Sequence, residues 1–194
     1  MMYKLCKTEQ SAIRQRQLEE GLLRAMETAR YEDITISDLC QKLGIPRKSF
    51  YRYFSGKDGA LHALLDHTLM EYQSFHSDSF VMDGRTLEMD MERFFRFWKS
   101  KTGLLDALER SNLSGLLIER AVAYTVTNAV FPSWFQPGES REMQHHVVVF
   151  ATCGLLSMVF RWHSEGFRED PHELGMVAAR LLSHPLFPAV RGNP

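Results

Sequence analysis

The stretch TISDLCQKLGIPRKSFYRYFSGK, residues 35–57, decides the fold. Thr35 and Asp38 have the pattern of a capping box at the start of a helix. The following apolar side chains recur at the spacing of one buried helical face: Ile36, Leu39, Cys40 and Leu43. Gly44 stands where a left-handed residue ends a helix, and Pro46 suits the start of the next one. The stretch therefore predicts two short helices around a tight turn.

The second of these helices combines basic, hydroxyl and aromatic side chains. Its segment RKSFYRYF, residues 47–54, has the residue types that contact phosphates and base edges when a helix lies in the major groove of DNA. Residues 39–57 contain no Asp or Glu but five basic residues, in a chain of net charge −1: Lys42, Arg47, Lys48, Arg52 and Lys57. A basic cluster is also typical of a plain solvated helix face, so on these features alone both interpretations stay open.

The order of residues 45–58 resembles the recognition-helix signature of the TetR/AcrR family of bacterial transcriptional regulators. A small polar residue and a hydroxyl precede an apolar residue; then come Tyr, any residue, an aromatic residue, Phe and a Ser-x-Lys-Asp run. With the helix before it, the resemblance covers about residues 13–69. Pro46 and Lys48 depart from the pattern, which often has Ser and Gly there. We therefore expect the DNA sequence that this chain binds to be its own.

The resemblance implies an all-α fold with an N-terminal three-helix, helix-turn-helix DNA-binding head at residues 1–56. It implies an α-helical ligand-binding and dimerisation domain at residues 57–194. The implied function is a ligand-responsive transcriptional regulator, a repressor, that binds double-stranded DNA at a palindromic operator and is released by a small organic effector. We predict that three residues lie at or near base edges: Arg47, Lys48 and Tyr51. Four others are predicted at DNA phosphates: Thr35, Ser49, Tyr53 and Lys57.

The bulk composition predicts a soluble, cytoplasmic protein. Its 194 residues are 44% hydrophobic and 24% charged, which is ordinary for a globular chain. The near-zero net charge argues against non-specific coating of nucleic acid or membrane, yet it permits one local basic patch. Three widely spaced cysteines without a CxxC pair are typical of reduced thiols: Cys6, Cys40 and Cys153. The first ten residues lack the apolar core of a signal peptide.

Helical periodicity continues on both sides of the quoted stretch. It predicts one helix from about residue 11 to 29 and a longer one from 57 to 76. Further helices are expected at about residues 87–101, 104–111, 112–130, 141–165 and 171–183. Asn112 is the expected N-cap of the 112–130 helix, whereas Thr102 and Gly103 are expected to break the chain between helices. Loops are expected at residues 77–85 and 132–140, and no strand is expected.

The aromatic side chains of the C-terminal part have two interpretations. At helical spacing they are by default a packed core. The alternative is an apolar pocket between helices that holds a small organic effector and orients it with a few polar groups. The resemblance implies a pocket in this region. The residues that we assign to it are Phe94, Trp98, Tyr124, Phe150 and Cys153.

The most apolar run, residues 147–160, predicts a covered helix. Fourteen residues are too few to span a bilayer, so we expect no membrane partner. A helix that is apolar on all sides must be covered on all sides, and a second copy of the chain supplies that cover. The resemblance implies the same: a homodimer in which residues 141–165 and 171–183 of each subunit form a four-helix bundle.

The common motifs of enzymes and metal sites are absent from the sequence. It contains no GxSxG, GxGxxG, P-loop, HExxH or paired-cysteine motif. The adjacent His145 and His146 would point about 100° apart on a helix, which is poor geometry for one metal. We therefore expect no enzyme activity, metal or cofactor. Two alternatives remain: a coactivator whose head docks on a protein, which the acid-free basic segment argues against, and an all-α enzyme without a recognisable motif.

Overall fold

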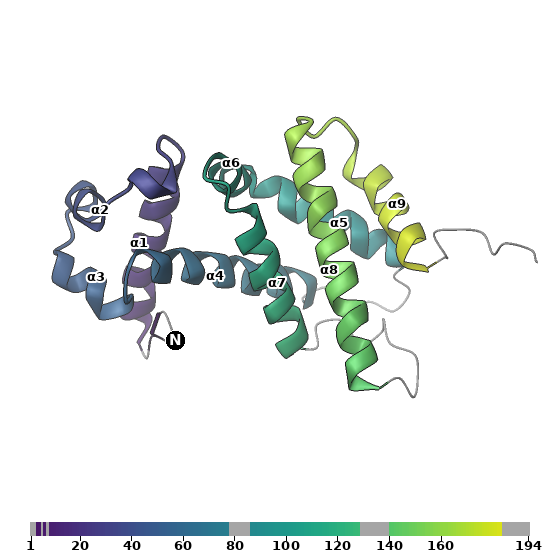
Figure 1. Cartoon of the computed structure of the whole chain (residues 1–194), viewed down its shortest axis with the longest axis horizontal. Coiled ribbons are helices and arrows are strands. Elements are labelled where there is room, and N and C mark those ends of the chain that lie inside the picture. Colours follow the sequence, from purple (N-terminus) through teal and green to yellow (C-terminus); the bar gives the residue numbers. More distant parts are fainter. Residues whose placement is uncertain (1–2, 5, 7, 78–85, 129–139, 184–194) are drawn as a thin grey trace, which may run out of the picture. The chain divides into compact units, whose positions relative to one another are not determined.

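A computed structural model describes residues 3, 4, 6, 8–77, 86–128 and 140–183. These residues form α-helices, one 3-10 turn and a single isolated β-bridge between Tyr3 and Phe54, so the predicted all-α fold is confirmed (Figure 1). The elements are α1 (Glu9–Met26), η1 (Tyr31–Asp33), α2 (Ile36–Leu43), α3 (Arg47–Tyr53), α4 (Lys57–Ser77), α5 (Leu87–Ser100), α6 (Thr102–Arg110), α7 (Ser114–Asn128), α8 (Arg141–Ser164) and α9 (Pro171–Ser183). Loops are predicted at residues 77–85 and 132–140. Ser77 is instead the last residue of α4, and Ser140 is the N-cap of α8. The rest of both loops, and the predicted helix end at residue 130, lie outside the described residues.

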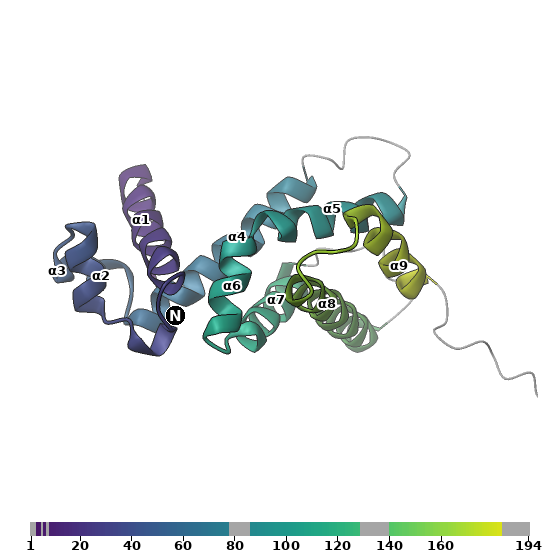
Figure 2. The same cartoon turned by 90° about the horizontal axis from the view of Figure 1, so that it is seen from above.

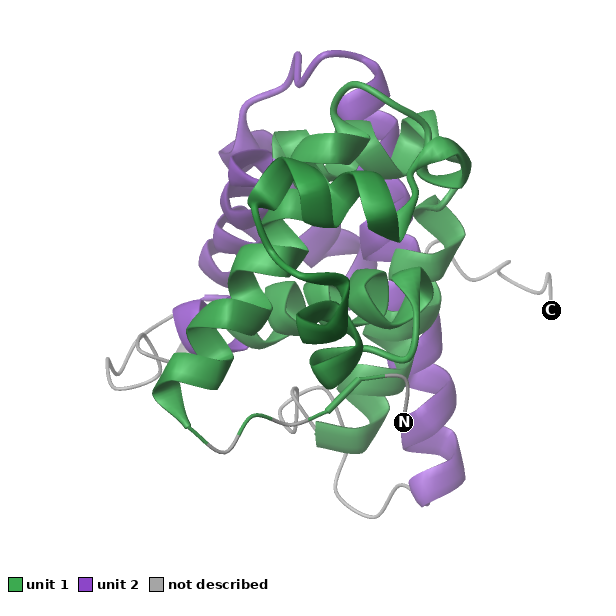
Figure 3. Cartoon of the chain, turned by 90° about the vertical axis from the view of Figure 1, so that its left-hand side faces the viewer, with its two compact units in different colours: residues 1–71, 102–130 green, residues 72–101, 131–194 purple. Residues whose placement is uncertain are grey.

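The chain forms two compact units, drawn in different colours in Figure 3. Unit 1 consists of residues 1–71 and 102–130, and unit 2 of residues 72–101 and 131–194. This division differs from the predicted boundary between residues 56 and 57, because α6 and α7 pack with the head. Two long-range contacts illustrate this: the N–H of Tyr31 donates to Ser111 Oγ, and Arg120 of α7 pairs with Asp66 of α4. The helix α4 begins in unit 1, and its residues from Tyr72 onward belong to unit 2.

The helix-turn-helix of unit 1 begins and ends where the sequence predicts. Thr35 caps α2, its hydroxyl accepting the N–H of Asp38 at 3.1 Å. Gly44 ends α2 in the left-handed region at φ 63°, where a side chain would be strained. Apolar residues from all three helices meet in the core of the head with at most 3% exposure: Leu18, Leu22, Met26, Leu39, Cys40, Phe50 and Phe54. The buried Ile34 joins them from the turn before α2.

The connection from α6 to α7 differs from the prediction. Asn112 does not cap α7; it takes a left-handed φ of 54° after the end of α6, and α7 begins at Ser114. The N–H of Leu113 donates to Leu108 O at 2.8 Å, the long backbone bond that closes a left-handed helix end. Thr102 and Gly103, expected to separate two helices, are instead the first residues of α6. Asn tolerates the left-handed conformation, so its role as a helix end competes with its role as a cap.

In unit 2, α5 and α9 lie side by side, as both Figure 1 and Figure 2 show. Their close approach depends on Gly175 of α9, because a Cβ added there would lie only 2.7 Å from the backbone N of Glu92 in α5. Helix α8 packs on α5 through Trp162, whose ring centroid lies 5.7 Å from that of Phe95. Gly166 follows the end of α8 in the left-handed region, at φ 76°.

Helix α8 is long and apolar, yet much of its surface is uncovered. By length and composition it could cross a membrane, since its most apolar window of 18 residues has a mean hydropathy of 1.5. Only 39% of that window is buried inside the chain. The apolar run, 147–160, is about 21 Å long as a helix, shorter than the roughly 30 Å hydrocarbon core of a bilayer. The sequence predicts a helix that is covered on all sides, and within one chain α8 is only partly covered.

Candidate nucleic-acid interface

The helix α3 has one buried aromatic face and one exposed basic face. Phe50 is fully buried, and its ring centroid lies 5.1 Å from that of Phe54, which follows the helix. These contacts fix the orientation of α3 on the head. The opposite face consists of exposed side chains with no acidic residue among them: Arg47, Lys48, Tyr51 and Arg52. The three residues predicted at base edges are thus all exposed on this one helix, and Tyr51 is 47% exposed.

The residues predicted at phosphates are in more varied surroundings. Thr35 is exposed, but its hydroxyl is also engaged with Asp38, donating to Oδ2 at 2.7 Å. Ser49 is half-buried in α3. Tyr53 is only 7% exposed, and its ring lies 6.3 Å from that of Phe54, so it belongs to the packing of the head. Its phosphate contact stays a prediction, one that burial disfavours.

Lys57 has a role that its position in the sequence did not indicate. Its Nζ atom donates to the carbonyl oxygens of Tyr31, of Glu32 at 3.2 Å and of Ile34 at 2.7 Å. The ammonium also lies over the Tyr31 ring, 4.3 Å from its centroid. An ammonium has three N–H donors, and these carbonyls account for all of them. Lys57 therefore joins the start of α4 to η1, and a phosphate contact by this side chain would compete with those bonds.

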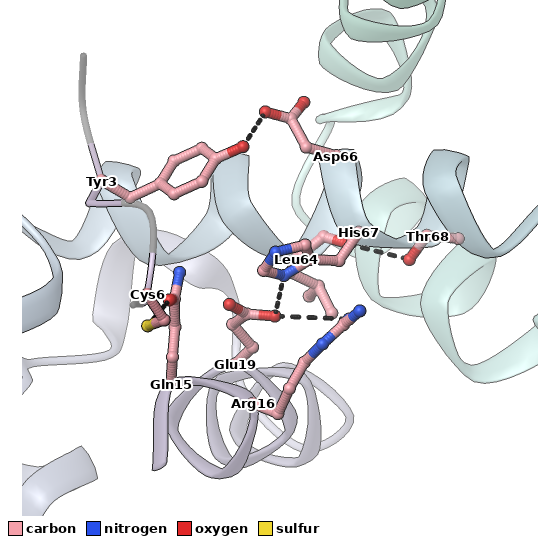
Figure 4. A network of polar contacts seen from close by, with 9 residues as sticks. All are labelled: Tyr3, Cys6, Gln15, Arg16, Glu19, Leu64, Asp66, His67 and Thr68. Carbon is pink, nitrogen blue, oxygen red and sulfur yellow. Dashed lines mark hydrogen bonds and ion pairs between the residues drawn. The ribbon is translucent and has the colours of Figure 1, made fainter. Parts of the chain in front are cut away.

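The structure also contains a polar network that the sequence analysis missed (Figure 4). Glu19 of α1 is fully buried, and its Oε2 lies 2.8 Å from Nδ1 of His67 in α4. Tyr3 donates from its hydroxyl to Asp66 Oδ2 at 2.7 Å, and Cys6 donates to Gln15 Oε1. Burial, with the nearby Asp66 carboxylate as the next cause, raises the pKa of the Tyr3 phenol. The only signal in the sequence was that Glu19 and Asp66 interrupt otherwise apolar helix faces.

The residues predicted to line an effector pocket are not brought together within either unit. Phe94 and Trp98 are 6% and 1% exposed and lie in an aromatic cluster with Tyr72, which favours the packed-core interpretation for them. Trp98 Nε1 has no hydrogen-bond partner among the described residues. Tyr124 is half-buried on α7 of unit 1, where burial raises its pKa. Cys153 is half-buried on α8.

Phe150, the fifth of these residues, is 65% exposed and lines an open groove between α8 and α9. The groove has a volume of about 180 Å³ and only apolar or glycine residues along it: Phe150, Ala151, Gly154, Leu155, Met158, Ala178, Leu181 and Leu182. It is therefore a surface for apolar contact. In the part of the chain that the structure describes, no three His, Cys, Asp or Glu side chains are grouped as ligands for a metal.

Comparison with known proteins identifies the fold. No model of a protein family and no curated protein matches the chain by sequence. Several solved structures resemble it over most of both chains, among them the following three. The dihydroxyacetone kinase operon activator DhaS has 15% identity and a TM-score of 0.60, over 88% of this chain and 94% of its own. The TetR-family repressor AlkX from Dietzia, implicated in biodegradation of n-alkanes, has 19% identity and a TM-score of 0.57, over 87% and 94%.

The third is the transcriptional regulator FadR from Bacillus subtilis, in complex with stearoyl-CoA. It has 12% identity and a TM-score of 0.55, over 86% of this chain and 96% of its own. At such low identity the agreement concerns the course of the backbone over most of the chain. The chain has the fold of the TetR-family transcriptional regulators.

Proposed function

We propose that this chain is a ligand-responsive transcriptional regulator of the TetR type. In this proposal it is a cytoplasmic repressor that binds a palindromic operator as a homodimer and is released by a small organic effector. The observation that carries the proposal is the exposed, acid-free face of α3 with Arg47, Lys48 and Tyr51. A helix face that only has to be solvated does not require exposed Arg, Lys and Tyr side chains together, opposite a buried aromatic face.

The proposed contacts follow from the position of each side chain on α3. Arg47 and Tyr51 are four residues apart, so they lie on one face of the helix, with Lys48 beside them. Arg and Lys donate to the acceptor atoms of guanine in the major groove, and the Arg fork makes two such bonds at once. The hydroxyls of Thr35 and Ser49 are suited to phosphates, which set the register of the protein on DNA.

The proposed dimer is supported by the apolar groove between α8 and α9. Exposed apolar side chains accompany it on the same helices: Met143, Phe150, Met176, Val177 and Leu181. We infer that a second copy covers this surface, because a two-fold dimer pairs the same patch on both subunits. Such a dimer also explains why α8 is so apolar and so little covered by its own chain. Two-fold symmetry would direct two α3 helices to half-sites in successive major grooves.

Release by an effector requires two conformations with different affinity for DNA. A ligand shifts such an equilibrium only when it binds one conformation more tightly than the other. The continuous helix α4, which begins beside η1 and ends in unit 2, is the element through which we propose that binding is transmitted. The stearoyl-CoA complex of FadR supports an organic effector with an apolar part. AlkX is a repressor, which supports repression as the role of this chain. DhaS, in contrast, is an operon activator.

Selection from a random pool of double-stranded DNA tests this proposal. The full chain is used, beside the double variant R47A/K48A and the control variant R24A, whose arginine is exposed on α1. We expect the wild-type chain and R24A to enrich the same two-fold symmetric sequence, and R47A/K48A to enrich none. The proposal is overturned when the wild-type chain enriches nothing, as a protein-docking head would, or when R47A/K48A enriches the same sequence equally well.

A further inference from the structure

The end of the recognition helix α3 is held by residues from the beginning of the chain. Tyr3 pairs with Phe54 in an isolated antiparallel bridge, and the N–H of Lys4 donates to Tyr53 O at 3.0 Å. We call Tyr3 and Lys4 the arm. Helix α3 has seven residues, too few to be stable on its own, so its position depends on what holds its ends. The arm is one of these supports.

The side chain of Tyr3 connects the arm to α4. Its hydroxyl donates to Asp66 Oδ2 at 2.7 Å, and its ring meets that of His67 edge-on, with centroids 6.0 Å apart (Figure 4). Because burial and the Asp66 carboxylate raise its pKa, the phenol keeps its proton at neutral pH and remains a donor. The arm is thus fixed to α4 by a charge-assisted hydrogen bond, which is stronger than one between neutral groups.

The same carboxylate also binds α7. Asp66 is only 6% exposed, and Arg120 binds it through two N–H groups on one edge of its guanidinium: Nε lies 2.8 Å from Oδ1, and Nη2 donates to Oδ2. A buried carboxylate is tolerated only when it is paired with an opposite charge and hydrogen-bonded. Arg120 supplies the charge, and Tyr3 donates a further hydrogen bond. Elements that are far apart in the sequence, the arm, α4 and α7, therefore meet at one side chain.

We infer that Tyr3 and Arg120 are positioning residues that link α7 to the end of the recognition helix through Asp66 and the arm. The inference rests on the proposed function and adds a connection to it that does not pass through Lys57 at the start of α4. Tyr124, one of the predicted effector residues, lies one helical turn after Arg120 on α7. A ligand that moves α7 would therefore alter the backbone contacts of the arm with Tyr53 and Phe54.

Amide hydrogen exchange of the full chain without DNA tests the link directly. The reporter is the N–H of Lys4, whose bond to Tyr53 O joins the arm to α3. The buried amides of Leu22 and Leu65 report opening of the unit as a whole. Tyr3→Phe removes only the hydroxyl and leaves the Asp66–Arg120 pair intact. Arg120→Met breaks the pair, and Arg120→Lys keeps a single charge. Arg24→Met is the matched control, since it breaks an exposed Arg–Glu pair on α1.

We expect Tyr3→Phe and Arg120→Met each to raise Lys4 exchange, relative to Leu22 and Leu65, by about ten- to a hundredfold, the ratio expected for one hydrogen bond to a charged group. Arg120→Lys should restore part of the protection, and Arg24→Met should change nothing. The double variant Y3F/R120M should match the single variants, because both act through Asp66. The inference is overturned when Lys4 exchange is unchanged in Arg120→Met, or rises only in step with Leu65.

Binding to the selected DNA gives the functional readout. Tyr3→Phe should weaken it several-fold, while Arg24→Met binds as the wild type does. Equal binding by Tyr3→Phe and wild type would refute the positioning role while leaving the proposed function intact. If the wild-type chain selects no DNA, the proposed function fails, and the exchange measurement still decides the link on its own.

Discussion

At the scale of single residues, Lys57 demonstrates how neighbours determine a role. Its place at the start of a long helix suggested a phosphate contact, whereas its ammonium donates to carbonyl oxygens of Tyr31, Glu32 and Ile34. Those carbonyls belong to the turn that precedes α2. Lys57 therefore stabilises the junction between the helix-turn-helix and α4, and any influence on DNA binding would follow from that junction.

Lys57→Met should destabilise the chain. The change keeps most of the apolar stem but removes the charged donors, so we expect the free energy of unfolding to fall by about 1.5–3 kcal/mol. Urea unfolding followed by circular dichroism measures it. The control is Lys42→Met, an exposed lysine in the last turn of α2, which should change stability by less than about 0.5 kcal/mol. Equal stability of the two variants would contradict the structural role of Lys57.

The exposed residues of the candidate site were predictable from the sequence, and the buried polar ones were not. Arg47, Lys48 and Tyr51 are solvent-facing because the helical period places Phe50 inward, a local property. Asp66, by contrast, depends on Arg120, which is 54 positions away, and on Tyr3, which is 63 positions away. No local pattern encodes such a pairing, because it exists only once the helices have packed.

At the scale of helices, boundaries were predictable wherever a capping residue had one dominant role. Thr35, Gly44 and Pro171 begin or end their helices as expected, because hydroxyl caps, left-handed glycine and first-turn proline each have a clear preference. Asn112 satisfies two preferences, the cap and the left-handed turn, and the second prevails at the end of α6. The compact units were not predictable either, since the packing of α6 and α7 with the head rests on distant contacts.

The contact between α5 and α9 predicts a strong effect of a single methyl group. In Gly175→Ala the new Cβ would lie 2.7 Å from the N and 2.9 Å from the Cα of Glu92, backbone atoms that cannot move aside without shifting a helix. We expect a loss of about 1–3 kcal/mol in the free energy of unfolding. Chemical unfolding measures it, beside Gly115→Ala on α7, where nothing lies within 4 Å of an added Cβ.

That control variant should be as stable as the wild type, or more stable by up to about 1 kcal/mol, because alanine is the better helix former. If Gly175→Ala and Gly115→Ala had the same free energy of unfolding, α9 would not approach α5 as closely as described. The contact would then be adaptable rather than fixed by the glycine.

At the scale of the whole molecule, the exposed apolar surface of α8 and α9 indicates a binding partner. The groove between them is apolar throughout, and Phe150 stands 65% exposed at its side. Patches of this kind on one chain mark contact surfaces. The sequence indicated the need for cover from composition alone, and the structure adds which face of the helix pair is open.

Phe150→Glu should convert the proposed dimer into monomers, because it places a charge in the middle of the apolar contact. Analytical ultracentrifugation at micromolar concentration measures the change. The matched control is Met89→Glu on α5, since Met89 is also exposed, at 50%, but lies outside the groove. We expect Met89→Glu to remain dimeric. A wild-type chain that is monomeric, or one that partitions into lipid vesicles in place of pairing, would contradict the assignment.

The proposed reading of a DNA sequence by α3 is tested by comparing the sites selected by the wild-type chain and by Arg47→Ala. The arginine is exposed, so its removal should leave the fold unchanged. We expect the same palindrome for both proteins, with preference relaxed at one position of each half-site by about 1–3 kcal/mol, the contribution of one good base contact. Identical preferences at every position, or no enriched sequence for the wild-type chain, would contradict the proposed reading.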